Sequence, residues 1–182
     1  MNRYIILKFG VIILVFIFMT LFVACNKTHN TLDSDQAIEK YLLNTYGEEE
    51  NIDIQLCDDV HIKQFRFVGY TGGQKEELLG GLLLRQLDNN TYTILHGKAE
   101  KYGNKIVVSY YDTENEKILI GIVNNGPANK VIITASNGKQ CSYNLDKNNP
   151  SAYLFALDST DFKEFDFRFE DLNGNVVEWT WY

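Results

Sequence analysis

Short apolar runs, each ended by turn-forming residues, recur through the C-terminal part of the chain and constrain its fold more than any other feature. Asn, Gly, Asp or Pro separates these runs, which lie at residues 118 to 123, 131 to 135, 141 to 145, 152 to 157, 165 to 169 and 176 to 181. In the segment EFDFRFED, Phe165, Phe167 and Phe169 alternate with charged residues, so a strand places their rings on one face. Short strands at a spacing of roughly ten residues predict an antiparallel β-sandwich.

The segment before these runs predicts one helix followed by about five strands. Ser34 or Asp35 is a candidate N-cap for an amphipathic helix over 34–48, where apolar residues recur at spacings of three and four until Gly47. The strands are expected at 51–56, 61–70, 77–87, 91–100 and 105–111.

Two details refine this part of the prediction. The sequence Asp88-Asn89-Asn90 predicts a turn that joins two of these strands into a hairpin. Gly80 and Gly81, inside an apolar run, predict a bulge or a close approach of another group to the backbone.

The turn-rich segment YDTENEK at 111–117 separates the two parts. We therefore expect an α+β, mostly β chain with two domains, a helix with an antiparallel sheet at 34–112 and a sandwich at 117–182.

The first 24 residues have the layout of a secretory signal peptide. Arg3 and Lys8 precede an apolar run from Phe9 to Val23, and the small residue Ala24 follows it. The run has about 15 residues, whereas a membrane-spanning helix needs about 20. A removable signal peptide at 1–24 is favoured over the alternative, a permanent signal anchor.

Cys25 directly follows this segment. The sequence FVAC, residues 22–25, resembles the lipobox of bacterial lipoproteins, with Phe22 where leucine is usual. The resemblance implies that Cys25 carries a diacylglyceryl group on its sulfur, becomes the mature N-terminus and anchors the protein to the extracytoplasmic face of the cell membrane. Residues 25–33 are then a lipidated tether. A membrane-buried cysteine without modification is the alternative.

A second resemblance covers residues 118–181. This segment resembles the small immunoglobulin-like (Ig-like) sandwich that ends many exported proteins of Gram-positive bacteria. The matching motifs are mainly strand starts and turns: Gly121-Ile122-Val123, Lys130-Val131, Asn137-Gly138 and Asp171-Leu172-Asn173-Gly174. The resemblance implies a fold and no particular activity, because such sandwiches have many unrelated roles.

Charge and cysteine content limit the partners. Without Arg3 and Lys8 the chain has 15 basic and 24 acidic residues, a formal charge of −9. This charge argues against nucleic acid as a partner, since a basic patch supplies most of that affinity. Cys57 and Cys141 either form a disulfide, which an exported protein permits, or remain two thiols.

Motifs for nucleophilic catalysis, zinc binding and nucleotide binding are absent from the sequence, so no cofactor is expected. Asp58, Asp59 and His61 are the best metal candidates, with His96 or a loop carboxylate as a further ligand; a polar strand end is the alternative. Gly72-Gly73, near Lys75, is either an anion-binding nest or a hairpin loop.

The aromatic residues near the C-terminus also have two interpretations. Trp179 and Trp181 share a face with Val177, which favours a place in the core over a ligand platform. Tyr182, Tyr110 and Tyr111 complete the aromatic set, and Tyr182 lies on the opposite face of that strand.

These observations favour a membrane-anchored, non-catalytic interaction or accessory protein of the cell envelope, with the lipid as its membrane contact and another envelope protein as its partner. The alternative is an extracellular enzyme or enzyme inhibitor with a carboxylate site drawn from Asp58, Asp59, Glu76 and Glu77.

Overall fold

The computed structural model describes residues 31–47, 53–73, 78–88, 90–101, 105–113, 117–145, 148 and 150–179, all within one compact unit, Thr31–Tyr182. The signal segment and Cys25 lie outside the described residues. The elements are β1 (Thr31–Leu32), α2 (Asp35–Leu42), a π-helical turn (Leu43–Gly47), β2 (Ile54–Ile62), β3 (Phe65–Gly72), β4 (Leu78–Gln86), β5 (Tyr92–Lys101), β6 (Ile106–Thr113), β7 (Lys117–Asn124), β8 (Lys130–Ala135), β9 (Gln140–Asn144), β10 (Ser151–Asp158), β11 (Phe165–Glu170) and β12 (Val176–Val177).

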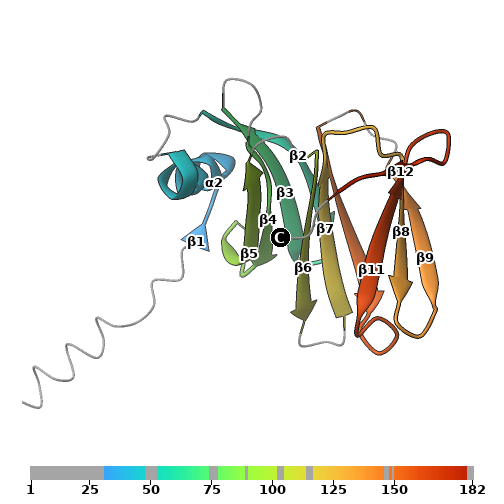
Figure 1. Cartoon of the computed structure of the whole chain (residues 1–182). Helices are drawn as coiled ribbons and strands as arrows, with labels where there is room; N and C mark the ends of the chain where they lie inside the picture. The colour runs from blue at the N-terminus through green and yellow to red at the C-terminus, as the bar shows by residue number, and fades with distance from the viewer. Residues whose placement is uncertain are drawn as a thin grey trace, which may run out of the picture. The chain divides into compact units, whose positions relative to one another are not determined.

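The strands form three sheets in which the neighbouring strands run antiparallel. The strand orders are β1-β5-β4-β3-β2 in a five-stranded sheet, β10-β7-β6 in a three-stranded sheet and β12-β11-β8-β9 in a four-stranded sheet. Within the residues it describes, the structure therefore confirms a mostly β fold with one short α-helix and antiparallel sheets (Figure 1).

The predicted helix forms because it has both a cap and an apolar face. Ser34 is the N-cap, and its Oγ accepts a hydrogen bond from the backbone N–H of Ala37 at 3.2 Å. Ile38 and Leu42 are one turn apart on the same face, and both are fully buried. The α-helix ends at Leu42, and the π-helical turn extends to the expected end at Gly47.

The five-stranded sheet has an apolar cluster on each face. The first cluster joins the sheet to α2 through Ile38, Leu42, Val68, Tyr70, Leu82 and others. The second joins its opposite face to the three-stranded sheet through Phe67, Leu79, Leu83, Leu119, Val123, Leu154 and others. The five-stranded sheet is consequently covered on both sides.

A third cluster joins the three-stranded sheet to the four-stranded sheet. It includes Ile120, Ile122, Val131, Ile133, Phe167 and Phe169. Phe167 and Phe169 are buried while Arg168 between them is exposed, as the alternation in the sequence predicts. In Figure 1 the helix and the three sheets follow one another from left to right.

Gly80 and Gly81 mark a close approach, one of the two predicted possibilities. A Cβ at Gly80 would lie 2.3 Å from the ring of Tyr70, and a Cβ at Gly81 would lie 2.3 Å from the ring of Phe67. The ring of Phe67 lies equally close to Gly121 on β7. These glycines are required because two aromatic rings occupy the space of the missing side chains.

Two predicted strands differ in the structure. Residues 61–70 are not one strand, because the chain turns at Lys63 and Gln64 and the hairpin β2–β3 results. Lys63 adopts a φ of 53°, a left-handed conformation that its residue type does not signal. The last predicted strand, 176–181, is reduced to Val176–Val177 among the described residues.

The predicted boundary between the two parts falls in the connection between β6 and β7. These two strands pair along their whole length, from Ile106 with Asn124 to Thr113 with Lys117. β6, expected in the helix-and-sheet part, therefore belongs to the same sheet as β7 and β10.

Candidate functional site

The β2–β3 hairpin carries most of the polar residues for which chemistry was predicted. The register between the strands shifts between Leu56 and Asp58, which leaves Cys57 as the additional residue of a β-bulge. Beyond the bulge, Asp58 pairs with Gly69 and Asp59 pairs with Val68. Since successive residues of a strand point to opposite faces, the two carboxylates point away from each other.

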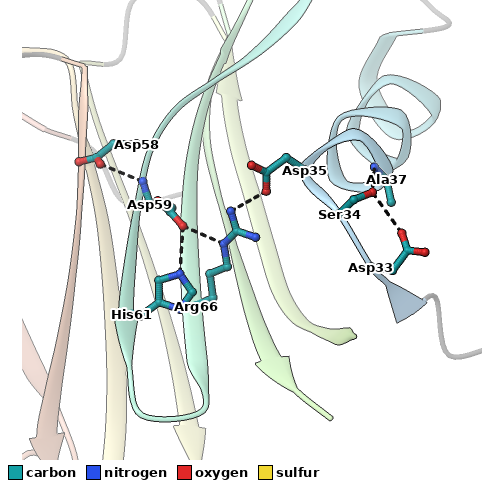
Figure 2. A network of polar contacts seen from close by, with 8 residues as sticks. All are labelled: Asp33, Ser34, Asp35, Ala37, Asp58, Asp59, His61 and Arg66. Carbon is teal, nitrogen blue, oxygen red and sulfur yellow. Dashed lines mark hydrogen bonds and ion pairs between the residues drawn. The ribbon is translucent and has the colours of Figure 1, made fainter. Parts of the chain in front are cut away.

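On the face that carries α2, Asp59 takes part in a network of ion pairs (Figure 2). Its Oδ2 lies 2.9 Å from Nε of Arg66 and 3.1 Å from Nε2 of His61. Arg66 then donates from Nη2 to Oδ1 of Asp35 in the first turn of α2, at 2.7 Å. The network therefore links the hairpin to the start of the helix.

Arg66 is the centre of this network. Its side chain is 11% exposed, whereas those of Asp35 and His61 are 64% and 51% exposed. Burial acts to lower the pKa of Arg66, but its hydrogen bond to Asp35 and the charges of Asp35 and Asp59 together raise it. Arg66 also lies 5.6 Å from the ring centre of Tyr92, within cation–π range.

Asp58 makes a different contact, on the other face of β2. Its Oδ2 accepts a hydrogen bond from the backbone N–H of Ala152 on β10 at 3.1 Å. Figure 2 shows Asp58 directed away from Arg66 and the helix. This carboxylate ties the five-stranded sheet to the edge of the three-stranded sheet, which is a structural role.

The predicted metal ligands do not converge. The structure confirms that Asp59 and His61 share a face, but Asp58 lies on the other one. His96 pairs with Leu83, which belongs to the cluster on the face away from α2, so it too is separated from His61. Within the described ranges, no group of three His, Cys, Asp or Glu side chains is placed to hold a metal ion.

A carboxylate pair for hydrolysis is not formed by Asp58 and Asp59, because they face opposite sides of the sheet. Glu76 and Glu77 lie outside the described residues. The contact of Asp59 with His61 orients an imidazole as a general base requires, yet Asp59 is the only hydrogen-bond partner of the His61 imidazole in the part of the chain that the structure describes.

The glycine pair predicted as a possible anion nest forms a hairpin end. Gly73 has a φ of 87°, and its N–H donates to the backbone oxygen of Asp53 at 3.0 Å. That N–H is therefore already used within the fold. Lys75, the cation near this segment, lies outside the described residues.

The two cysteines of the described residues do not form a disulfide with each other. Cys57 lies on β2 and Cys141 on β9, in different sheets. Burial raises the pKa of the Cys141 thiol, which keeps it protonated.

For Trp179, the interpretation as a core residue is confirmed. Its ring lies 5.5 Å from that of Phe167 and 5.2 Å from that of Phe169, and Nε1 donates to the backbone oxygen of Phe167. Tyr111 packs against the apolar cluster between the five- and three-stranded sheets. Tyr110 is 53% exposed, with its ring edge-on to Phe165. Trp181 and Tyr182 lie outside the described residues.

Sequence patterns do not predict the contact between Arg66 and Asp35. They assign no role to Arg66 and indicate only a capping role for Asp35. The signal that pairs Arg66 with Asp35 has two parts. One is an acidic residue in the first turn of the helix, and the other is an arginine on the sheet face that the helix covers.

Comparison with models of known protein families, with curated proteins and with solved structures finds no match for this chain. Among the described residues, no helix has both the length and the apolar character that crossing a bilayer requires.

Proposed function

We propose that the chain is an extracytoplasmic lipoprotein, anchored to the cell membrane through a diacylglyceryl group on Cys25, and that its folded unit is a non-catalytic interaction or accessory protein of the cell envelope. The observation that carries the proposal is the sequence FVAC at the end of an apolar segment of signal-peptide length. Two acyl chains hold a protein on a membrane far more firmly than a single one does.

The first strand determines how far the folded unit reaches from this anchor. Thr31 and Leu32 pair with Thr93 and Tyr92 of β5, so only residues 26–30 separate Cys25 from the sheet. Five residues span at most about 18 Å when fully extended. In the proposed lipoprotein the first strand therefore lies within about 18 Å of the lipid-bearing residue, which keeps the folded unit next to the membrane surface.

The contacts of the polar residues support a binding role over a catalytic one. Asp58 holds β10, while Asp59 and Arg66 hold α2, so the side chains best suited to chemistry stabilise the fold. The finer fold assignment belongs to the same proposal: residues 117–182 form an Ig-like sandwich to which β6 adds a strand, and it packs against the helix-and-sheet part that makes up the rest of residues 34–112.

The experiment is metabolic labelling of the producing bacterium with radioactive palmitate, followed by fractionation. Wild-type protein is expected to carry the label and to remain with the membranes. Cys25→Ser is expected to lose the label and to change its fractionation. Cys57→Ser and Cys141→Ser are matched controls and should keep both properties. Label retained in Cys25→Ser, or absent from the wild type, would refute the anchor.

A further inference from the structure

The terminal strand β9 differs from the other sheet edges of the described structure. β2 contains a bulge and the charged pair Asp58–Asp59, and Asp58 also covers the adjacent edge of β10. β5 contains a bulge and Lys98, and its first residues pair with β1. β6 lies against β5, and β12 has only two residues. Bulges, charges and shortness are the usual protection of an edge strand.

β9 has none of these features. It is Gln140-Cys141-Ser142-Tyr143-Asn144, without a charge or a proline, and its register with β8 does not shift. Gln140, Ser142 and Asn144 are exposed, whereas Cys141 and Tyr143 pack against the core between the two neighbouring sheets. The strand is therefore regular, uncharged and accessible along its outer edge.

The hydrogen bonds of the β8–β9 hairpin show which backbone groups face outward. Ala135 donates to the oxygen of Lys139 at 2.8 Å, and Leu145 donates to the oxygen of Asn129 at 2.6 Å. Hydrogen-bonded pairs alternate along an antiparallel ladder, so Cys141 and Tyr143 bond to β8. The N–H and C=O groups of Gln140, Ser142 and Asn144 consequently point away from β8.

We propose that β9 pairs antiparallel with β9 of a second copy of this chain, about a two-fold axis at Ser142. In this register Ser142 faces Ser142 of the second copy, and Gln140 faces Asn144 of the second copy. Each of these pairs consists of residues with outward backbone groups, so each forms two main-chain hydrogen bonds. Other symmetric registers overlap fewer residues. The interface is isologous, and two four-stranded sheets become one continuous sheet.

Side chains and charge favour a copy of the chain as the occupant. The register places amide opposite amide and hydroxyl opposite hydroxyl on the exposed face, and Cys141 opposite Tyr143 on the core face. A two-fold contact brings identical charges together, which opposes self-association of a chain with a formal charge of −7. β9 has no charged residue, so this register sets no like charges directly opposite each other.

The proposal does not depend on the lipid anchor. Attachment to a membrane raises the local concentration of the chains and strengthens any association between them. The residues that pair, however, belong to the folded unit, and the test compares variants of β9 only.

The experiment measures the self-association of the full chain in detergent by analytical ultracentrifugation over a concentration series. Ser142→Lys places two ammonium groups opposite each other at the axis, and a decrease of at least ten-fold in the association constant is expected. The double variant Gln140→Lys/Asn144→Glu places a lysine of each copy opposite a glutamate of the other copy. We expect this variant to associate at least as strongly as the wild type. All three positions are exposed, so the fold remains intact.

Ser136→Lys is the matched control, because it makes the same substitution at an exposed residue of the β8–β9 turn, outside the strand. It should associate as the wild type does. The proposal is overturned if the wild type stays monomeric up to about 1 mM, if Ser142→Lys associates normally, or if Ser136→Lys weakens association equally. If the chain dimerises through another edge, Ser142→Lys associates normally. If β9 binds a different chain instead, the wild type stays monomeric.

Discussion

At the scale of single residues, Ser109 has a buried hydroxyl group that makes no hydrogen bond within the described structure. It is 3% exposed on β6, opposite Gly121, and its Oγ is the one buried side-chain polar atom without a hydrogen-bond partner among the described residues. Burial of an unpaired hydroxyl costs about 1–3 kcal/mol. The apolar clusters around it offset this cost, so the strand still forms.

Ser109→Ala is therefore expected to leave the free energy of unfolding unchanged or to raise it by about 1 kcal/mol. Ser151→Ala is the control, because Ser151 is equally buried but donates to Oη of Tyr153 at 3.2 Å. Its removal should lower the free energy of unfolding by about 1 kcal/mol. Urea unfolding measures both, and equal losses in the two variants would contradict the prediction.

His96 makes stability depend on pH. Burial lowers its pKa below the ordinary value of 6.5, and the charge of Lys98 lowers it further. The folded state therefore binds the proton less readily than the unfolded chain, so stability is complete above pH 6.5 and decreases as the pH falls through that value.

Thermal unfolding at a series of pH values measures this contribution. The midpoint of the wild type should fall more steeply than that of His96→Gln between about pH 7.5 and pH 5.5. The carboxylates of the chain contribute equally to both proteins and cancel in the comparison. Parallel curves for the two proteins would contradict the assignment.

At the scale of elements, Arg66 connects α2 to the sheet beneath it. Arg66→Gln is expected to lower the free energy of unfolding by about 1–3 kcal/mol, because it removes two ion pairs and a ring contact from a mostly buried side chain. Asp35→Asn should cost only about 0.5 kcal/mol, since Asp35 is 64% exposed.

A double-mutant cycle separates the ion pair from other effects. Asp35→Asn and Arg66→Gln are expected to couple by about 0.2–1 kcal/mol, and less at high salt. Asp33→Asn makes the same charge change beside the same helix, where Asp33 contacts Ser34, and should show no coupling to Arg66→Gln. Coupling of equal size for Asp33 would indicate a general charge effect.

The elements show which parts of the fold are readable from sequence. Alternation along 165–169 predicts a strand because one face is buried, and Ser34 predicts the helix start because its side chain caps it. The turn at Lys63–Gln64 was missed, since neither residue is a usual turn former. The bulge at Cys57 has no side-chain signature either, and it decides which of Asp58 and Asp59 lies on the face that carries α2.

The polar network was beyond prediction for a related reason. Arg66 and Asp35 are 31 residues apart, and their contact depends on how α2 crosses the sheet. Sequence patterns fix which residues share a face but leave open which element covers that face.

At the scale of the whole molecule, three apolar clusters connect α2 to the four-stranded sheet without interruption. The middle cluster combines Phe67 and Leu83 of the five-stranded sheet with Leu119 and Val123 of the three-stranded sheet. Because opening that interface exposes buried apolar side chains on both sides, neither part can unfold without destabilising the other.

The folded unit should therefore unfold in a single transition, and tryptophan fluorescence allows a direct test. Trp179 packs beside Phe169 of the four-stranded sheet, so its fluorescence reports on that end of the molecule. Ile38 lies on the buried face of α2 and Ile133 lies on β8, both fully buried, and Ile→Val at either position costs about 0.5–1.5 kcal/mol. With one cooperative transition, Ile38→Val shifts the fluorescence midpoint in denaturant as Ile133→Val does. With independent unfolding of the two parts, Ile133→Val would shift it and Ile38→Val would leave it unchanged.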